Sequence, residues 1–254
     1  MSEESIYRSL AGRSVIVTGG GSGIGEAISL AFGRQGAKVG IIEKNGETGE
    51  GVAAAIDATG GTAFSVAADV TSISQLQAAL AVLRDRHGPI DVLVNNAGND
   101  TRHAFEDMTP DYWDDRLTVN LKHMAFAAQF VMADMRDKGR GVIVNLGSTS
   151  WMQGAAGMVA YTTAKSAVAG LTRSLARELG VHGIRVMCVA PGRVVTARTI
   201  AQGMTDEWVQ QTKDRQCLKE LVLPDDIARL ILWLSSDDAR MVTSQTYVLD
   251  GGVV

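Results

Sequence analysis

The chain has 254 residues, of which 46% are hydrophobic and 20% charged, as is typical of a globular domain. Its net charge of −4, with no cluster of lysine or arginine along the sequence, argues against a nucleic-acid partner. No apolar run approaches the ~20 residues that cross a bilayer, and the polar, acidic start MSEESIYRSLAGR is unlike a secretory signal, so no membrane partner is expected.

The cysteines and histidines indicate neither a disulfide framework nor a metal site. Cys188 and Cys217 lack metal-ligand spacing, and we interpret both as reduced thiols of a cytoplasmic protein. The four histidines form no HExxH or similar array, so we expect no metal.

Short β-rich runs alternate with helical patterns, and no linker or repeat divides the chain. Strands are expected at 14–18, 38–42, 62–66, 90–94, 141–146, 184–189 and 245–249, and helices at 24–35, 47–58, 74–87, 110–138, 159–179 and 224–235. The alternation predicts a single α/β domain over residues 1–254. This would be a doubly wound, seven-stranded parallel sheet of Rossmann type with helices on both faces. Any ligand should lie beyond the carboxyl ends of the strands.

The first predicted strand ends in a glycine-rich turn, TGGGSGIG at 18–25, which leads into a helix. Glycines at 19, 23 and 25 let the backbone approach a pyrophosphate, while the helix N-terminus offers unpaired N–H groups. The spacing is not that of the general GxGxxG fingerprint, and a plain connection is the alternative. The strand before the turn and the helix after it favour a dinucleotide site.

Glu43 closes the second predicted strand, KVGIIE. A carboxylate there accepts hydrogen bonds from a ribose 2′-hydroxyl and repels a 2′-phosphate, although a solvated strand-end charge is the alternative. Lys44 follows and would soften the repulsion, but the glycine-rich turn contains no arginine or lysine that would bind a 2′-phosphate. We therefore predict NAD as the cofactor rather than NADP.

Tyr161 and Lys165 are four positions apart on a predicted helix, so they share a face. A tyrosine with its ordinary pKa of ~10 is a poor base. An ammonium ~4 Å away, at an effective dielectric constant of ~20, contributes about 4 kcal/mol. We expect this to bring the pKa of Tyr161 toward the operating pH of a general base. The alternative for such a pair is a solvated helix face.

In their order along the chain these motifs resemble those of the short-chain dehydrogenase/reductase family. TGGGSGIG resembles its TGxxxGIG turn, NNAG at 95–98 its NNAG motif, and DGG at 250–252 its C-terminal ending. Asp69-Val70 resembles its adenine-contacting pair, and the segment from Pro191 to Thr196 resembles the one that meets the nicotinamide. The resemblance implies a catalytic set of Asn120, Ser148, Tyr161 and Lys165.

Within that resemblance, Lys165 also hydrogen-bonds the nicotinamide ribose, and Ser148 holds the substrate oxygen. Asn120 anchors a water that links Lys165 to solvent. Taken alone, Ser148 would be a turn former and Asn120 a kink in its helix. The expected cofactor-binding residues are Gly19, Ser22, Gly23, Ile24, Gly25, Glu43, Asp69, Val70, Asn96, Ala97, Gly98, Tyr161, Lys165, Pro191, Gly192, Val194 and Thr196.

Aromatic and polar side chains near Ser148 favour a sugar substrate. Trp151 offers an aromatic plate for the C–H face of a sugar ring, with ordinary packing as the alternative. The run NDTRH at 99–103 offers several groups for hydroxyls, with a hydrated loop as the alternative. The expected substrate contacts are Asn99, Arg102, Ser148, Trp151, Gln153 and Tyr161.

The runs YWDD at 112–115 and QCLK at 216–219 resemble NAD-dependent bacterial aldose 1-dehydrogenases, which oxidise xylose, arabinose or galactose to lactones. That resemblance implies that Tyr161 takes the proton of the anomeric hydroxyl while the C1 hydride passes to nicotinamide C4. A mobile flap over the sugar is expected at 193–222, including Arg193 and Arg198. The alternatives are a carbonyl or 3-oxoacyl reductase, a secondary-alcohol dehydrogenase, or an inactive binding protein; Glu43, the polar loop and the intact catalytic set argue against them.

The predicted helices 110–138 and 159–179 carry many small and apolar residues, which favours a subunit interface over an internal helix pair. The resemblance implies a homotetramer, with residues 252–254 joining a contact. The residues concerned are Ala125, Ala127, Ala128, Ala164, Ala167, Val168 and Leu171.

Overall fold

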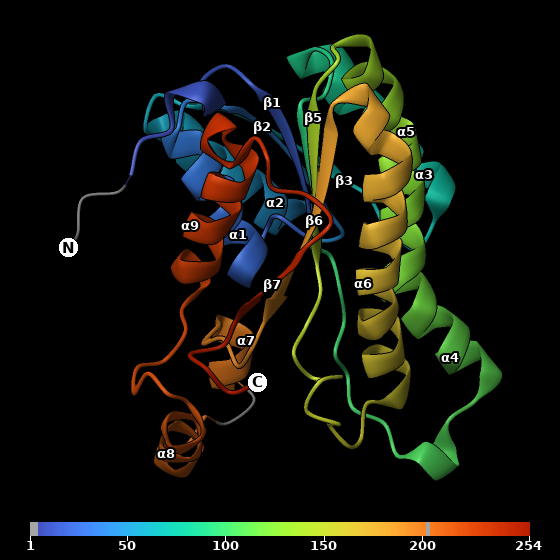
Figure 1. Ribbon diagram of the computed structural model, residues 1–254, viewed down its shortest axis with the longest axis vertical. Coiled ribbons are helices and arrows are strands. Elements are labelled where there is room, and N and C mark those ends of the chain that lie inside the picture. Colours follow the sequence, from blue (N-terminus) through green and yellow to red (C-terminus); the bar gives the residue numbers. More distant parts are fainter. Residues whose placement is uncertain (1–4, 202–203) are drawn as a thin grey trace.

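The computed structural model describes residues 5–201 and 204–254. Within them, seven strands pair in parallel in the order β3-β2-β1-β4-β5-β6-β7 (Figure 1). This confirms the predicted doubly wound sheet, and its order reverses between β1 and β4, where a ligand crevice is expected. The strands are β1 (Ser14–Thr18), β2 (Lys38–Glu43), β3 (Thr62–Ala67), β4 (Val92–Asn95), β5 (Gly141–Leu146), β6 (Ile184–Pro191) and β7 (Thr246–Leu249).

Helices cover both faces of the sheet, with α1, α2 and α9 on one side and α3, α5 and α6 on the other (Figure 1). Capping residues mark where two of these helices begin. The side chains of Ser72 and Thr109 accept hydrogen bonds from backbone amides in the first turns of α3 and α4. The bounds are α1 (Gly23–Arg34), α2 (Gly46–Ala58), α3 (Ile73–His87), α4 (Pro110–Leu117), α5 (His123–Asp137), α6 (Val159–Leu179), α7 (Ala197–Ala201), α8 (Asp206–Arg215) and α9 (Pro224–Ser235).

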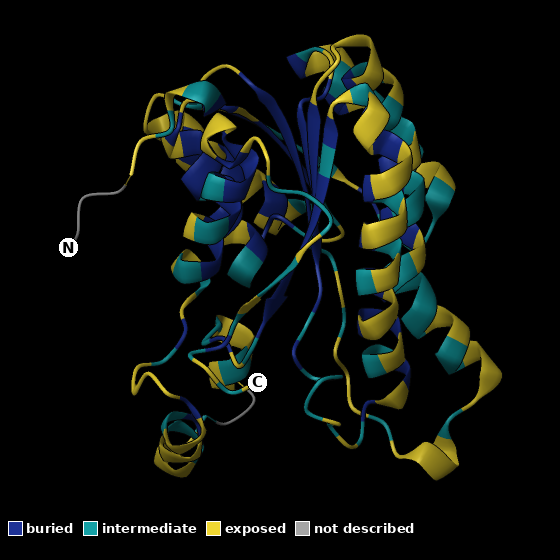
Figure 2. Ribbon diagram, viewed as in Figure 1, coloured by how far each residue is buried: buried dark blue, intermediate teal, exposed yellow. Residues whose placement is uncertain are grey.

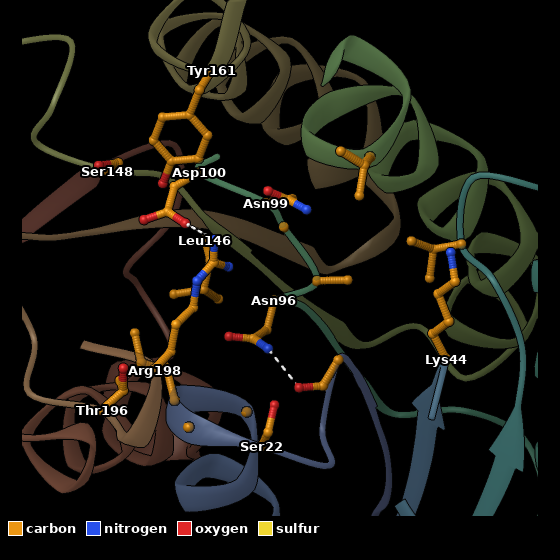
Figure 3. A pocket seen from close by; sticks show the side chains of 18 of the residues that line it. Ser22, Lys44, Asn96, Asn99, Asp100, Leu146, Ser148, Tyr161, Thr196 and Arg198 are labelled. Atoms are coloured by element: carbon orange, nitrogen blue, oxygen red, sulfur yellow. Dashed lines mark hydrogen bonds and ion pairs between the residues drawn. The ribbon is translucent and has the colours of Figure 1, made fainter. Parts of the chain in front are cut away.

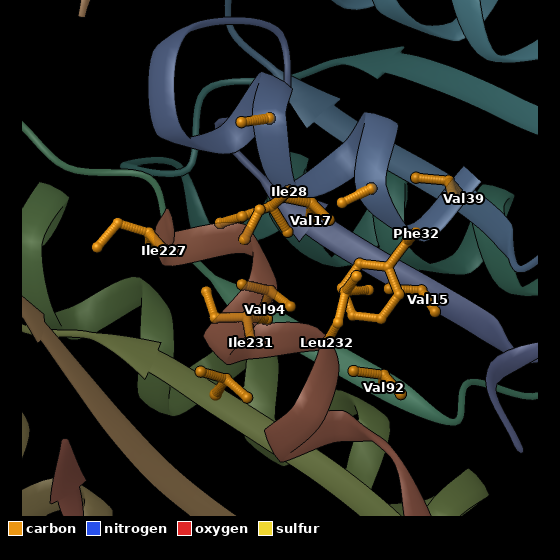
Figure 4. Close-up of a cluster of buried hydrophobic side chains, with 14 of the residues drawn as sticks. Val15, Val17, Ile28, Phe32, Val39, Val92, Val94, Ile227, Ile231 and Leu232 are labelled. Atoms are coloured by element: carbon orange, nitrogen blue, oxygen red, sulfur yellow. The ribbon is translucent and has the colours of Figure 1, made fainter. Parts of the chain in front are cut away.

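The central strands are buried on both faces, which explains why they read as continuous apolar runs (Figure 2). On one face, Phe32 and Ile28 of α1 pack with Ile231 of α9 against the sheet (Figure 4). Phe32 has no exposed surface, so this layer holds the glycine-rich turn before α1 on a rigid base.

The prediction of one continuous α-helix over 110–138 is wrong. It is divided into α4, a π-helical turn η3 (Thr118–Lys122) and α5. Asn120 lies in this turn, and its side-chain Nδ2 donates to the Arg116 carbonyl oxygen at 2.9 Å. A side chain that competes for backbone acceptors in this way favours the local irregularity.

Helices α7 and α8 lie beyond the carboxyl end of β6, in the expected flap, and the sequence analysis missed both (Figure 1). A start signal for α8 was available, because the Thr205 side chain caps the Trp208 amide and two acidic residues follow it. Residues 202 and 203 of the expected flap lie outside the described residues. In the described part of the chain, no helix has both the length and the apolar character needed to cross a membrane.

Candidate active site

A pocket of about 560 Å³ opens at the carboxyl ends of the strands (Figure 3). Tyr161 and Ser148 lie toward one end, and Lys44 lies toward the other. All the residues expected to bind the cofactor line it, from Gly19 in the first turn to Thr196 after β6. The structure therefore brings together side chains that are far apart in the sequence, at the place where the fold class predicts a ligand.

The glycine-rich turn has no room for larger residues. A Cβ at Gly25 would collide with the Gly19 carbonyl oxygen and with Asn96 Nδ2, and Gly23 has a φ of +55°, which favours glycine. Ser22 is the N-cap of α1, but its side chain makes no capping hydrogen bond. The first N–H groups of α1 are thus available beside the pocket, which fits a pyrophosphate.

The carboxylate of Glu43 is held in place at the other end of the pocket. Its Oε2 accepts from the Gly21 amide at 3.1 Å, and its Oε1 accepts from the Lys44 amide at 2.8 Å. The Lys44 ammonium does not soften this charge, because its Nζ pairs with Asp69 Oδ2 at 2.7 Å. Burial opposes ionisation of Asp69, yet hydrogen bonds from Lys44 and Thr71 lower its pKa. The carboxylate of Glu43 therefore lines the pocket without an ion pair to Lys44.

The NNAG segment after β4 is tied to the glycine-rich turn. Asn96 Nδ2 donates to the carbonyl oxygens of Thr18 and Gly19, both at 3.0 Å. Two residues further, a Cβ on Gly98 would lie 3.0 Å from Asn120 Oδ1 and 3.4 Å from Lys165 Nζ. These contacts fix the floor of the pocket, so the segment has a structural role beside the predicted cofactor contacts.

Asn120 does not line the pocket; its side chain positions the loop that follows NNAG. Its Oδ1 accepts from the Asn99 amide at 2.9 Å, and its Nδ2 donates to the Asn99 carbonyl oxygen at 3.0 Å. The interpretation of Asn120 as a helix kink is also supported, since it lies in η3. Its predicted role in anchoring a water stays a prediction.

Tyr161 and Lys165 lie together at the pocket, with Lys165 Nζ 5.7 Å from the centroid of the Tyr161 ring. The expectation that Lys165 lowers the pKa of Tyr161 toward neutral is wrong for this structure. Burial raises the pKa of Tyr161 to about 12, and the carboxylate of Asp100 also favours the protonated phenol. A hydrogen bond from Ser148 and the charge of Arg198 act in the opposite direction.

The ammonium of Lys165 points to the end of β5. Its Nζ donates to the Leu146 carbonyl oxygen at 2.7 Å, and burial lowers its pKa to about 8. The neighbouring His123 is fully buried, and burial followed by the charge of Lys165 lowers its pKa to about 3. His123 is therefore neutral and donates from Nε2 to the Ala97 carbonyl oxygen at 3.2 Å, a positioning contact that the sequence analysis did not identify.

The sequence analysis also missed an ion pair across the pocket. Arg198 on α7 lies 2.8 Å from the carboxylate of Asp100, which is on the loop after β4, and both residues line the pocket (Figure 3). This pair joins the expected flap to the body of the protein. Asp100 raises the pKa of Tyr161 and Arg198 lowers it, so the pair makes two opposing contributions to the proton affinity of the phenol, both smaller than that of burial.

Replacing Asp100 with asparagine is expected to lower the pKa of Tyr161. The substitution removes a carboxylate that stabilises the protonated phenol, and it leaves the charge of Arg198 without its partner, so both effects have the same sign. In the oxidation direction, the rising limb of kcat/KM against pH should move to lower pH by about half a unit, since solvent weakens the field of a half-exposed carboxylate. Arg198→Gln should move the same limb to higher pH. If the rising limb of kcat/KM for Asp100→Asn lies at the same or a higher pH, the claim that Asp100 raises the pKa of Tyr161 is contradicted.

The expected substrate residues fall into two groups. Asn99, Ser148 and Tyr161 line the pocket, whereas the other three do not. Gln153 is committed to Thr149 Oγ1 at 2.8 Å and to Arg215 at 2.8 Å. Arg102 donates to the Ala156 carbonyl oxygen at 3.1 Å, and Trp151 is half-buried. Among residues 5–201 and 204–254, no group of three or more His, Cys, Asp or Glu side chains is arranged to hold a metal ion.

Comparison with known proteins agrees with this geometry. A family model described as enoyl-(acyl carrier protein) reductase matches residues 19–254. The D-xylose 1-dehydrogenase of Caulobacter vibrioides is 42% identical over 98% of both chains. The chain belongs to the short-chain dehydrogenase/reductase family. It is thus an NAD(P)-dependent oxidoreductase that acts on CH–OH groups.

Other members of the short-chain dehydrogenase/reductase family extend the comparison. A probable galactose dehydrogenase of Rhizobium meliloti is 39% identical over 98% of both chains. A 7α-hydroxysteroid dehydrogenase, solved with NADH and 7-oxo glycochenodeoxycholic acid, superposes with a TM-score of 0.92 at 32% identity. The superposition covers 97% of this chain and 96% of the chain of the steroid dehydrogenase. The described part of the chain therefore follows the family fold.

Proposed function

We propose that this protein oxidises the anomeric hydroxyl of an aldose to a lactone, with NAD as the cofactor. The observation that carries the proposal is that one pocket holds Glu43 at one end and Ser148 beside Tyr161 at the other. The similarity to xylose and galactose dehydrogenases supports the choice of an aldose.

In the proposed reaction, the nicotinamide supplies the acceptor for the C1 hydride. Ser148 holds the anomeric oxygen through its hydroxyl, and Tyr161 accepts the proton of that hydroxyl. Lys165 stays close to Tyr161, bound to the Leu146 carbonyl oxygen, and carries a positive charge below its pKa of about 8. Because burial keeps Tyr161 protonated at neutral pH, oxidation should become faster as the pH rises.

The direct test is a panel of pentoses and hexoses incubated with the protein and NAD. We expect NADH absorbance to appear with at least one aldose and a lactone to accumulate before it hydrolyses. If no aldose in the panel yields NADH, the aldose proposal is rejected.

The preference for NAD is expected to depend on the charge of Glu43. Glu43→Gln keeps the size of the side chain but removes the repulsion of a 2′-phosphate, so the ratio of kcat/KM for NAD to that for NADP should fall about 10-fold or more. Glu50→Gln, the same charge change on the exposed part of α2, is the control. Comparable kcat/KM with both cofactors in the unchanged protein would contradict the predicted preference.

A reductase of 3-oxoacyl thioesters or other ketones is the second candidate. The same Ser148 and Tyr161 would serve it in the opposite direction, with the protonated phenol as the acid. The pocket argues against it, because Asp100, Arg198 and Asn99 make its substrate end polar rather than apolar.

We also propose a homotetramer, a cytoplasmic location and a flap over 193–222. The prediction of a tetramer was based partly on apolar residues of two helices. Their exposed surface is smaller than expected, because Ala127, Ala128, Ala164 and Val168 are buried within the subunit. Ala167 stays exposed on α6. Both cysteines are free thiols, which supports the cytoplasm. Light scattering that shows a monomer at micromolar concentration would reject the tetramer.

A further inference from the structure

The ion pair between Asp100 and Arg198 crosses the pocket between the glycine-rich turn and Tyr161. Arg198 Nη2 lies 2.8 Å from Asp100 Oδ1, both residues line the pocket, and about half of each side chain is exposed. In Figure 3 the Arg198 side chain extends from the side of the pocket where Ser22 lies toward Asp100. Asp100 in turn lies beside Tyr161. A dinucleotide whose pyrophosphate meets the turn and whose nicotinamide reaches Tyr161 must therefore pass this pair.

The base of the Arg198 side chain is held beside the glycine-rich turn. A Cβ on Gly23 would lie 3.6 Å from Thr196 Cγ2, and Thr196 is two residues before Arg198. The Thr199 amide donates to Thr196 Oγ1 at 3.2 Å, and Thr199 Oγ1 donates to the Val194 carbonyl oxygen at 3.0 Å. These bonds fix the backbone at the start of α7. Only the side chain of Arg198 then has to rotate for its guanidinium to face the turn.

The other cations that line the pocket in the described part of the chain are bound to other groups. Two of them pair with carboxylates near them, and the third is buried and donates to a backbone carbonyl oxygen at the end of β5. Arg198 differs from these, because its partner comes from a loop across the pocket. The other three cations are Lys44, Arg116 and Lys165.

A pyrophosphate is a better partner for Arg198 than the carboxylate of Asp100. Solvent screens an ion pair whose members are half exposed, so the pair contributes little free energy. A guanidinium matches the oxygens of a phosphate group with two parallel hydrogen bonds, and both partners are charged. A pyrophosphate at the glycine-rich turn should therefore displace Asp100 from Arg198.

We propose that Arg198 is a cofactor-binding residue that changes partner. It pairs with Asp100 across the pocket before the cofactor binds, and with the pyrophosphate of NAD afterwards. The carboxylate of Asp100 thus competes with the cofactor for the guanidinium. The proposal concerns the pyrophosphate, so it does not depend on which alcohol the protein oxidises.

Calorimetric titration with NAD tests this exchange, because the two partners should have opposite effects. Arg198→Gln should raise the dissociation constant for NAD about 10-fold, since charge-assisted hydrogen bonds to the pyrophosphate are lost. Asp100→Asn should lower it about threefold, since the competing carboxylate of a half-exposed pair is removed. If the pair only joins α7 to the loop after β4, both substitutions break it and both weaken binding. The proposal is overturned if Asp100→Asn does not tighten binding or if Arg198→Gln does not weaken it.

ADP-ribose identifies the part of the cofactor that Arg198 binds. It keeps the adenosine, the pyrophosphate and the second ribose of NAD but lacks the nicotinamide. Arg198→Gln should raise the dissociation constant for ADP-ribose by the same factor as that for NAD. A loss of affinity for NAD alone would place Arg198 at the nicotinamide and contradict the proposal.

The double variant, Asp100→Asn with Arg198→Gln, should bind NAD as weakly as Arg198→Gln does, because the carboxylate acts through the guanidinium. Recovery of tight binding in the double variant would contradict this. Arg229→Gln is the matched control, since it breaks an exposed ion pair with Asp226 on α9, and neither of these described residues lines the pocket. It should leave the affinity for NAD unchanged. If it weakens binding as much as Arg198→Gln does, loss of charge alone explains the effect and the proposal is overturned.

The test is independent of the proposed function, because every readout is a binding constant rather than turnover. If the unchanged protein binds NADP more tightly than NAD, the same titrations are made with NADP, which carries the same pyrophosphate. That result would reject the predicted preference for NAD. The opposite effects expected for Asp100→Asn and Arg198→Gln would still decide the proposal.

Discussion

Replacing Tyr161 with phenylalanine is expected to lower kcat by about 10²–10⁴-fold while the dissociation constant for NAD changes less than about twofold. The substitution keeps the ring that lies 5.7 Å from Lys165 Nζ and removes only the hydroxyl that bonds with Ser148. Proton transfer is therefore lost, whereas the pocket lining around the cofactor is kept. Initial rates of NADH formation and calorimetric titration with NAD measure the two quantities.

Tyr247→Phe is the matched control for this experiment. Tyr247 lies on β7, where its ring packs edge-on against Trp233, and it does not line the pocket. The control should retain turnover close to that of the unchanged protein. If Tyr161→Phe keeps more than about a tenth of the original turnover, Tyr161 is not the group that transfers the proton. General acid–base catalysis contributes about 10²-fold or more to the rate, so its loss should lower turnover further than that.

Replacing Gly25 with alanine is expected to weaken NAD binding by about 10–100-fold and to lower the free energy of unfolding by about 1–3 kcal/mol. The new methyl group would collide with the Gly19 carbonyl oxygen and with Asn96 Nδ2. Neither neighbour moves freely, because Asn96 also binds the Thr18 carbonyl oxygen. The turn must therefore shift away from the position in which its amides face a pyrophosphate.

The control for that substitution is Gly51→Ala on α2. A Cβ at Gly51 meets nothing within 4 Å, and alanine favours a helix by roughly 0.5–1 kcal/mol over glycine. This variant should bind NAD normally and unfold at the same or a higher denaturant concentration. Equal NAD affinities for the Gly25→Ala and Gly51→Ala variants would contradict the placement of the cofactor at the turn.

The sequence by itself determined the fold class and the location of the cofactor pocket. Its motifs lie at strand ends, and the carboxyl ends of parallel strands meet at one edge of a sheet, so their order along the chain implies their proximity. This is why every residue expected to bind the cofactor, including Glu43 and Thr196, lines the same pocket. Helix α6 was also predicted with its observed bounds, because its pattern is long and regular.

Only the tertiary structure decided the electrostatics of the site. The sequence places Lys165 one helical turn from Tyr161, but burial determines the pKa of the phenol, and burial depends on segments that are distant along the chain. The same holds for the Asp100–Arg198 pair, whose two residues come from the loop after β4 and from α7. Sequence spacing predicts neighbours within a helix or at a sheet edge, whereas contacts between loops follow from how the whole chain packs.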